Sequence, residues 1–223
     1  MPDQIGAQQL QLLRARVEAE MPAPACITIT SACERDGKSV TASGLAEHLA
    51  GAGYRVLIVD AGSSKAKKRL SVAAPSGAAT IETVLKHIAK TTVYKLDALG
   101  LAPEFAAAAS AETVRALVRD FRDAYDYTLI DASRLLEGNL GLLFAAASDG
   151  TLLSIRRGRG AVAADSEMIR VLESGHIKIL GVVTASPAAI RDHSRRVSRS
   201  APVTSRTYEE TAAPAGMSAV RSG

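Results

Sequence analysis

Residues 27–39, ITITSACERDGKS, decide the fold of this chain. They begin inside an apolar run over 26–31 that is typical of a buried strand, pass through a loop, and open onto an Ala-rich helix expected over 39–50. Compared with the phosphate-binding template G-x-x-x-x-G-K-[ST], the stretch matches at three of four diagnostic positions. Those positions are occupied by Ala32, Gly37, Lys38 and Ser39. The sequence therefore predicts a phosphate-binding loop between a strand and a helix.

The expected chemistry of this loop is nucleotide binding. Backbone N–H groups, reinforced by the positive end of the following helix, surround a β-phosphate. Lys38 reaches the β- and γ-phosphate oxygens, Ser39 holds Mg²⁺, and Val40 completes the expected nucleotide-binding set. ATP and Mg²⁺ are accordingly the expected cofactors.

Three residues of the loop depart from what a polyanion site favours. Arg35 stands where a close approach of backbone to phosphate usually demands glycine. Glu34 and Asp36 add two carboxylates beside the expected phosphates. Two interpretations stay open: the loop binds nucleotide, or it survives only as architecture.

Composition indicates one globular α/β domain with tails. The chain has 223 residues, a length at which a folded domain buries about 70% of the surface of its unfolded chain. Of these residues, 47% are hydrophobic and 22% are charged. Aromatic residues are 4% and tryptophan is absent, so no platform for stacking bases and no specific nucleic-acid partner are expected. Cys26 and Cys33 are expected to be free thiols in a reducing compartment.

No secretory signal and no apolar stretch of about 18 residues is evident, which predicts a cytoplasmic protein. A membrane partner could still hold it at the inner face of the cell membrane. The four histidines are scattered, without the spacing of a metal site.

The chain divides into three expected parts. Residues 1–24 form an amphipathic helix with a linker, packed either on the domain or on a neighbouring subunit of a homo-oligomer. Residues 25–186 form the phosphate-loop domain. Residues 187–223 form a basic tail that is expected to be disordered, and either solvated or in contact with an anionic surface.

Strands and helices alternate through the central part. Expected strands cover 26–31, 56–60, 93–99, 125–131, 150–155 and 178–184. Expected helices cover 39–50, 80–90, 112–124, 138–147 and 161–173, and 103–110 reads as a loop. This order predicts a doubly wound, mostly parallel sheet of about six to seven strands flanked by helices, the fold class of P-loop NTPases.

Two of the expected strands end in a carboxylate. Asp60 closes one and Asp131 the other, which places both at the carboxyl edge of the sheet where ligands of such folds bind. A strand ending in Asp is the pattern of a Walker B motif, so Asp131 joins Ser39 as an expected Mg²⁺ ligand. As an alternative, either Asp could merely cap a turn.

Three segments together resemble the bacterial tyrosine kinases of capsule and exopolysaccharide synthesis, within the MinD/ParA class of P-loop ATPases. They are the 31–39 loop, the 56–60 strand and the 125–131 strand, and the resemblance runs over about residues 8–183. It implies that Lys38 and Ser39 act as the Walker A pair, that Asp131 is the Walker B carboxylate, and that Asp60 activates the attacking hydroxyl.

Several positions depart from that family. Gly62 replaces the second carboxylate of a D-x-D motif, Cys33 replaces the signature lysine of MinD/ParA loops, and Tyr208 stands alone where the kinases have a tyrosine cluster. Ala132-Ser133-Arg134 replaces the usual Thr-Pro-Pro, and the ring-forming motif of the N-terminal helix is reduced to Gln8, Gln11 and Arg14.

Three functions follow from the resemblance. The first is a degenerate kinase-like domain that regulates a membrane polysaccharide chain-length or export protein, with weak or no catalysis. The second is an active ATP-dependent protein tyrosine kinase or ATPase. The third is a positioning ATPase of the MinD/ParA kind, which Cys33 disfavours.

Overall fold

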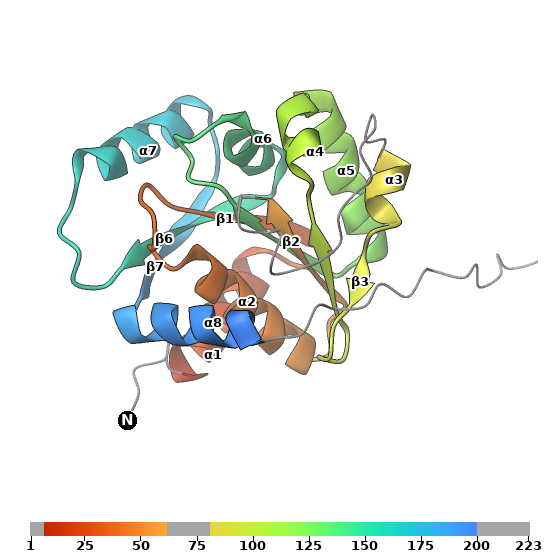
Figure 1. Cartoon of the computed structure of the whole chain (residues 1–223), viewed down its shortest axis with the longest axis horizontal. Helices are drawn as coiled ribbons and strands as arrows, with labels where there is room; N and C mark the ends of the chain where they lie inside the picture. Colours follow the sequence, from red (N-terminus) through yellow and green to blue (C-terminus); the bar gives the residue numbers. More distant parts are fainter. Residues whose placement is uncertain (1–6, 62–80, 200–223) are drawn as a thin grey trace, which may run out of the picture.

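The computed structural model describes residues 7–61 and 81–199, which form a seven-stranded sheet with helices on both faces (Figure 1). The strand order is β3-β4-β2-β5-β1-β6-β7. All neighbours pair in parallel except β3 with β4. The predicted mostly parallel, doubly wound sheet is confirmed.

All strands except β3 follow the alternation expected from the sequence. Their bounds are β1 Ala25–Thr30, β2 Val56–Ala61, β3 Ala89–Lys90, β4 Leu96–Gly100, β5 Tyr127–Ala132, β6 Gly150–Arg156 and β7 Ile179–Ala185. The helices are α1 Ala7–Glu20, α2 Lys38–Gly51, α3 Ile81–Leu85, α4 Pro103–Ala108, α5 Ala111–Ala124, α6 Asn139–Ala147, α7 Ala163–Ser174 and α8 Pro187–Arg199. Among these residues, no helix is long and apolar enough to cross a membrane.

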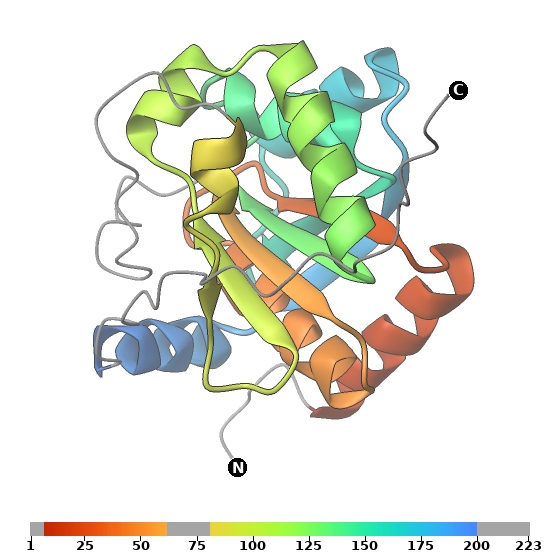
Figure 2. The same ribbon diagram turned by 90° about the vertical axis from the view of Figure 1, so that its right-hand side faces the viewer.

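Helices α1, α2 and α8 lie on one side of the sheet and α3 to α7 on the other (Figure 1). Every residue of β1 is buried, because this central strand is covered on both faces. Alternate side chains enter different cores: Ile27 and Ile29 pack toward α2, whereas Cys26 belongs to the cluster with α5 and α6. Figure 2 shows the twist of the sheet between these two layers.

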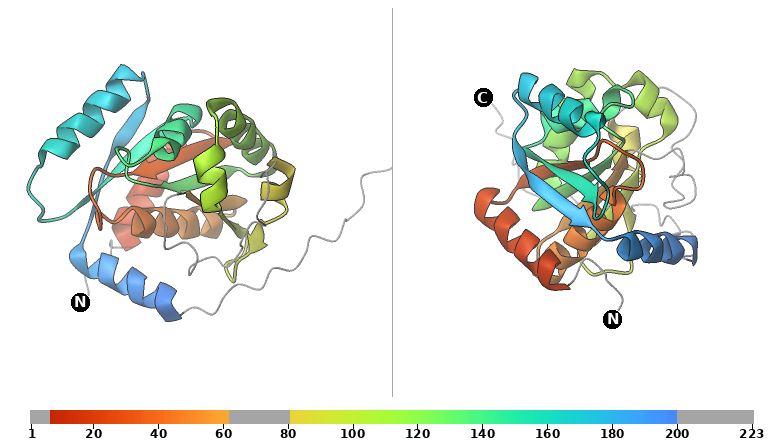
Figure 3. Two further views of the ribbon diagram at one scale, coloured as in Figure 1. Left: turned by 45° about the horizontal axis from the view of Figure 1, so that its top comes forward. Right: turned by 90° about the vertical axis from the view of Figure 1, so that its left-hand side faces the viewer.

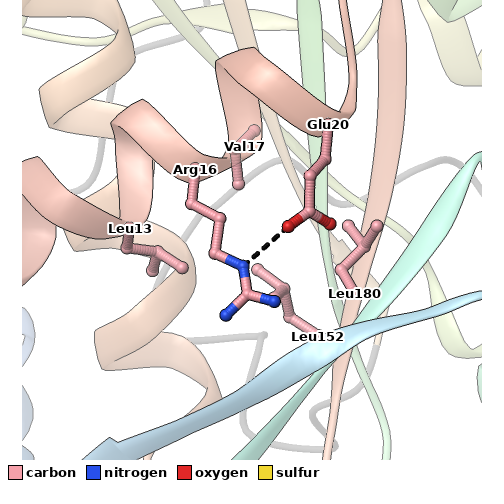
Figure 4. Close-up of a pocket in the computed structure, with 6 residues that line it drawn as sticks. All are labelled: Leu13, Arg16, Val17, Glu20, Leu152 and Leu180. Atoms are coloured by element: carbon pink, nitrogen blue, oxygen red, sulfur yellow. Dashed lines mark hydrogen bonds and ion pairs between the residues drawn. The ribbon is translucent and has the colours of Figure 1, made fainter.

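Helix α1 packs on its own domain, which is one of the two placements that the sequence left open. Leu10 and Val17 are buried, and Leu10 approaches Gly44 so closely that a Cβ there would lie 2.9 Å from the leucine side chain. At the end of α1, the Tyr127 hydroxyl donates to the Met21 carbonyl at 3.1 Å. Toward β6 and β7, the Arg16–Glu20 ion pair spans a shallow apolar hollow (Figure 4).

Two sequence expectations between β2 and α5 are wrong. The helix expected over 80–90 ends at Leu85, and Ala89–Lys90 instead pair with β4, where Lys90 Nζ lies 2.8 Å from Asp97. The loop expected over 103–110 contains helix α4, because Pro103 starts a run of alanines and Phe105 anchors it in the core at 2% exposure.

The disorder expected from residue 187 is also wrong for its first part, because α8 covers Pro187–Arg199. Ser186 caps it: its side-chain oxygen accepts from the Ala189 N–H at 3.1 Å. Ala189 is buried in a small cluster with Leu10 and Ala185. Helices α7 and α8 flank the β6–β7 end of the sheet from opposite sides (Figure 3). Residues 200–223 lie outside the described part.

Candidate nucleotide-binding site

The phosphate loop, residues 31–37, connects β1 to α2 at the carboxyl edge of the sheet. Gly37 ends the loop with φ 91°, a conformation that favours glycine. A Cβ at Gly37 would also lie 2.3 Å from Cβ of Ala185, closer than any real contact. Both the backbone and the packing therefore demand the glycine that the template predicts.

The first half of the loop is tied to the neighbouring segment after β5. The Thr30 hydroxyl donates to the Ser133 carbonyl at 2.8 Å, and the Leu135 N–H donates to the Ser31 carbonyl at 3.2 Å. Within the loop, the Ser31 hydroxyl donates to the Cys33 carbonyl at 2.8 Å. These bonds fasten the loop to itself and to its neighbour without help from a ligand.

Lys38 lies across the loop. Its Nζ donates to Ser31 Oγ at 3.2 Å, and the side chain is half-buried. Burial lowers the pKa of Lys38, an effect opposed by the nearby carboxylates of Asp131 and Asp36. A partly desolvated ammonium of this kind gains more from a phosphate than a fully hydrated one.

The carboxylate of Asp36 is turned toward the end of β6 and the Arg159 loop that follows it. It is fully buried and accepts two hydrogen bonds from the Arg159 guanidinium, both at 3.0 Å. The Arg156 N–H adds a third at 3.3 Å, and the Ser154 hydroxyl donates to the Asp36 carbonyl at 2.7 Å. The charge that looked unfavourable in the sequence is thus compensated by an arginine.

The other two unusual loop residues lie at the surface. Glu34 is exposed and forms an ion pair with Arg134, whose Nη2 lies 3.8 Å away. Arg35 is exposed and has φ 59°, which costs a non-glycine residue about 1 kcal/mol. Arg35 therefore adopts a left-handed backbone conformation that favours glycine.

Asp60 and Asp131 are brought together as the sequence predicts. They are paired in the β2–β5 ladder and are 7% and 9% exposed. Ser39 is half-buried in the first turn of α2. A hydroxyl and one or two carboxylates, completed by phosphate oxygens and water, form a donor set that Mg²⁺ favours, so these residues fit the ion.

The two remaining predicted site residues can contribute only through their backbone. The side chain of Ala32 is buried in the cluster beneath α7, and Val40 packs against the cluster of Leu10 and Ala189. Gly62, the departure from D-x-D, lies outside the described residues.

Sequence reasoning missed the arginines of the site. Arg159 lies more than a hundred residues from Asp36, and no local motif links the two. In the sequence, Arg134 stands only as part of a departure from the kinase pattern, whereas in the structure it forms ion pairs with both Glu137 and Glu34. Only the packing of β6 beside β1 brings the Arg159 loop to the phosphate loop.

The sheet order, the phosphate loop and the paired aspartates define the fold of a P-loop NTPase. Solved structures agree. The kinase domain of Escherichia coli tyrosine kinase ETK superposes with a TM-score of 0.68 at 19% identity, covering 91% of this chain and 80% of that one. The chimerical protein CapA2B2 superposes with a TM-score of 0.66 at 22% sequence identity, covering 79% of this chain and 83% of that one.

MinD complexed with Mg-ADP, from Pyrococcus horikoshii, gives a TM-score of 0.55 at 18% identity, covering 80% of this chain and 79% of that one. The predicted resemblance to bacterial tyrosine kinase domains and MinD ATPases is thus confirmed at the level of the fold. No protein-family model and no curated protein matches the sequence.

Proposed function

We propose that this chain binds ATP with Mg²⁺ at the 31–39 loop and acts as a kinase-like regulatory domain. The observation that carries this proposal is the arrangement of charges around the loop. Lys38 crosses the loop with its Nζ 3.2 Å from Ser31 Oγ, while the Asp36 carboxylate is turned toward Arg159. The loop therefore presents a cation, and not its own buried anion, to a phosphate.

Each residue has a definite part in binding. The N-terminal end of α2 supplies backbone N–H groups and the positive end of the helix dipole. Lys38 donates to phosphate oxygens, and Ser39 and Asp131 hold the Mg²⁺, which neutralises phosphate charge when bound. Asp60, paired with Asp131 in the β2–β5 ladder, would orient an attacking hydroxyl or water.

The regulatory part of the proposal rests on the lost carboxylate at Gly62 and on the shared fold with bacterial tyrosine kinase domains. Phosphoryl transfer depends on positioned charges, so the loss of one acidic residue weakens catalysis more than folding. In this proposal the domain works in the cytoplasm, held at the inner face of the membrane by a polysaccharide chain-length or export protein. Nucleotide occupancy, and not turnover, sets its state.

A second candidate is an active ATP-dependent tyrosine kinase or ATPase. The juxtaposition of Asp60 and Asp131 favours it, because both carboxylates stand together at the edge where the γ-phosphate would lie. Measurable ATP turnover that Asp60→Asn abolishes would support this candidate over the regulatory one.

Calorimetric titration of the whole chain with ATP and ADP, each with and without Mg²⁺, tests the proposal. We expect binding that strengthens with Mg²⁺ and disappears in Lys38→Met. Lys86→Met is the matched control, because Lys86 is an exposed lysine that pairs only locally with Glu82. Lack of binding at millimolar nucleotide would exclude the proposed function.

A further inference from the structure

Arg159 serves two carboxylates that belong to different parts of the fold. Besides Asp36 in the phosphate loop, its guanidinium donates to both oxygens of Asp165, at 2.7 and 2.9 Å. The side chains of Arg159, Asp36 and Asp165 are only 9%, 0% and 13% exposed. This buried bridge, which we call the arginine clamp, joins the phosphate loop to the first turn of α7.

The α7 end of the clamp is fixed independently of the phosphate loop. Asp165 lies in the first turn of α7, and its Oδ2 also accepts from the Val162 N–H at 3.0 Å. Negative charge is favourable at that end of a helix. Arg159 is therefore held in place by α7 and presents its remaining N–H groups to Asp36.

The arginine clamp neutralises a negative charge that lies close to the expected phosphate site. Asp36 immediately precedes Gly37 and Lys38, the residues that approach the phosphates. Without Arg159 its buried carboxylate would lose two charge-assisted hydrogen bonds and remain as an unpaired anion, a strongly unfavourable state. It would either turn to water and open the loop, or stay as a negative charge beside the polyanion.

We infer that Arg159 is a positioning residue for the phosphate loop: it holds the Asp36 carboxylate away from the bound phosphates and fixes the loop before nucleotide arrives. The inference rests on the proposed function in that the ligand is a nucleoside triphosphate. The holding of the loop can be measured without that ligand.

The first experiment uses Cys33 as a reporter that lies inside the loop. Cys33 is half-buried, whereas Cys26 is fully buried in β1, where burial raises the pKa of its thiol to about 12. In Arg159→Met, labelling of Cys33 by a thiol reagent should be about tenfold faster, while Cys26 stays protected as in other closed segments. Arg170→Met is the control, because Arg170 is exposed on α7 and pairs with Glu167. Unchanged labelling of Cys33 in a folded Arg159→Met protein would overturn the inference.

The second experiment measures ATP affinity in a set of variants. Arg159→Met should weaken binding by about tenfold, within the range of coupling between linked sites. Arg159→Lys keeps the positive charge, so it should lose less ATP affinity than Arg159→Met does. It also replaces Arg159→Met in the comparison if that variant fails to fold. Asp36→Asn combined with Arg159→Met should regain most of the affinity, because the free anion is gone. Raising the salt concentration should narrow the difference between Arg159→Met and the wild type.

A merely structural role predicts a different result for Arg159→Met itself. If the clamp only stabilised the fold, an Arg159→Met protein that remains folded would bind ATP as tightly as the wild type, and that result would overturn the inference. If the proposed function fails but the inference holds, the two experiments give a different pattern of results. The wild type would not bind ATP, yet Arg159→Met would still accelerate labelling of Cys33, which supports the holding of the loop.

Discussion

Asp60 and Asp131 stand directly opposite each other in the parallel ladder between β2 and β5, and both are buried. Paired residues of neighbouring strands direct their side chains to the same face of a sheet, so two carboxylates share one small region. Lys38 is near enough to Asp131 for their charges to interact. Like charges so placed repel, and a cation relieves the repulsion. The relationship explains why a divalent ion fits here.

Replacing Asp131 by Asn should remove most of the gain in ATP affinity that Mg²⁺ provides. In the proposed site, one oxygen ligand of the ion would be lost and the negative charge would disappear, while the shape of the side chain is kept. We expect the ratio of ATP affinity with and without Mg²⁺ to fall by about tenfold, equivalent to about 1.4 kcal/mol. Calorimetric titration at fixed ionic strength measures this ratio.

Asp123→Asn is the control for that experiment, because it removes the same charge from an exposed position on α5. Its Mg²⁺ dependence should match the wild type. A full Mg²⁺ effect in Asp131→Asn would show that the ion, if bound, does not use this carboxylate.

Gly37→Ala should destabilise the fold more than Gly53→Ala does. Both positions have positive φ, 91° and 100°, so each substitution carries a backbone cost of about 1–2 kcal/mol. Only at Gly37 would the new Cβ overlap Cβ of Ala185, whereas nothing lies within 4 Å at Gly53. Urea unfolding of the two variants measures the difference. If both variants lost the same free energy of unfolding, β7 and α8 would have to move away from the new Cβ at Gly37 at no energetic cost.

The sequence predicts the central part of the fold because its signals are local. The apolar strand, the glycine of the loop and the Ala-rich helix are adjacent in the chain, and so are the apolar residues of β5 that lead to Asp131. Helix α8 also had a local signal, Ser186 followed by Pro187, which is typical of a helix start. The basic composition after residue 187 outweighed that signal and led to the wrong expectation of disorder.

The electrostatics of the site could not be predicted in the same way. Asp36 looked unfavourable because its partner Arg159 is distant in the chain and comes close only when β6 pairs with β1. Strand β3 is a second case. Its two residues form a strand only because β4 offers a free edge and Asp97 binds Lys90, neither of which shows in the periodicity of 80–90.

Nucleotide affinity should fall with rising pH, and the fall should begin below the pH at which an ordinary lysine loses its proton. Lys38 must be protonated to donate to phosphate, and its pKa is lowered by burial from the usual 10.5. Titrations with ADP at several pH values between about 8 and 10 follow this ionisation, since the phosphates of ADP are almost fully charged in that range. Lys38→Arg should bind with less pH dependence, because a guanidinium keeps its proton.

Acid should weaken the arginine clamp. The Arg159 guanidinium lowers the pKa of Asp165 from its ordinary 3.8. A carboxyl group with a depressed pKa stabilises the fold fully above its unfolded value and ceases to do so as the pH falls through its folded value. The wild type should therefore lose stability below about pH 4 more steeply than Asp165→Asn does. Urea unfolding midpoints of the wild type and Asp165→Asn, measured at several pH values between about 2 and 7, make the comparison. If the two midpoints changed in parallel with pH, the expectation would be contradicted.

Ala189→Glu should detach α8 and disturb the phosphate loop as well. Ala189 is 5% exposed among Leu10 and Ala185, so a glutamate there would bury an unpaired charge or push the helix away, at a cost of about 2 kcal/mol or more. Because the same cluster borders Gly37, where a Cβ would meet both Ala185 and Ile190, we expect weaker ATP binding together with the loss of stability. Hydrogen exchange of α8 and of residues 31–37 follows both changes. Arg195→Glu is the control, since Arg195 is exposed on the same helix and should affect neither. Faster exchange confined to α8, with the loop and ATP affinity unchanged, would show that this helix covers the loop without supporting it.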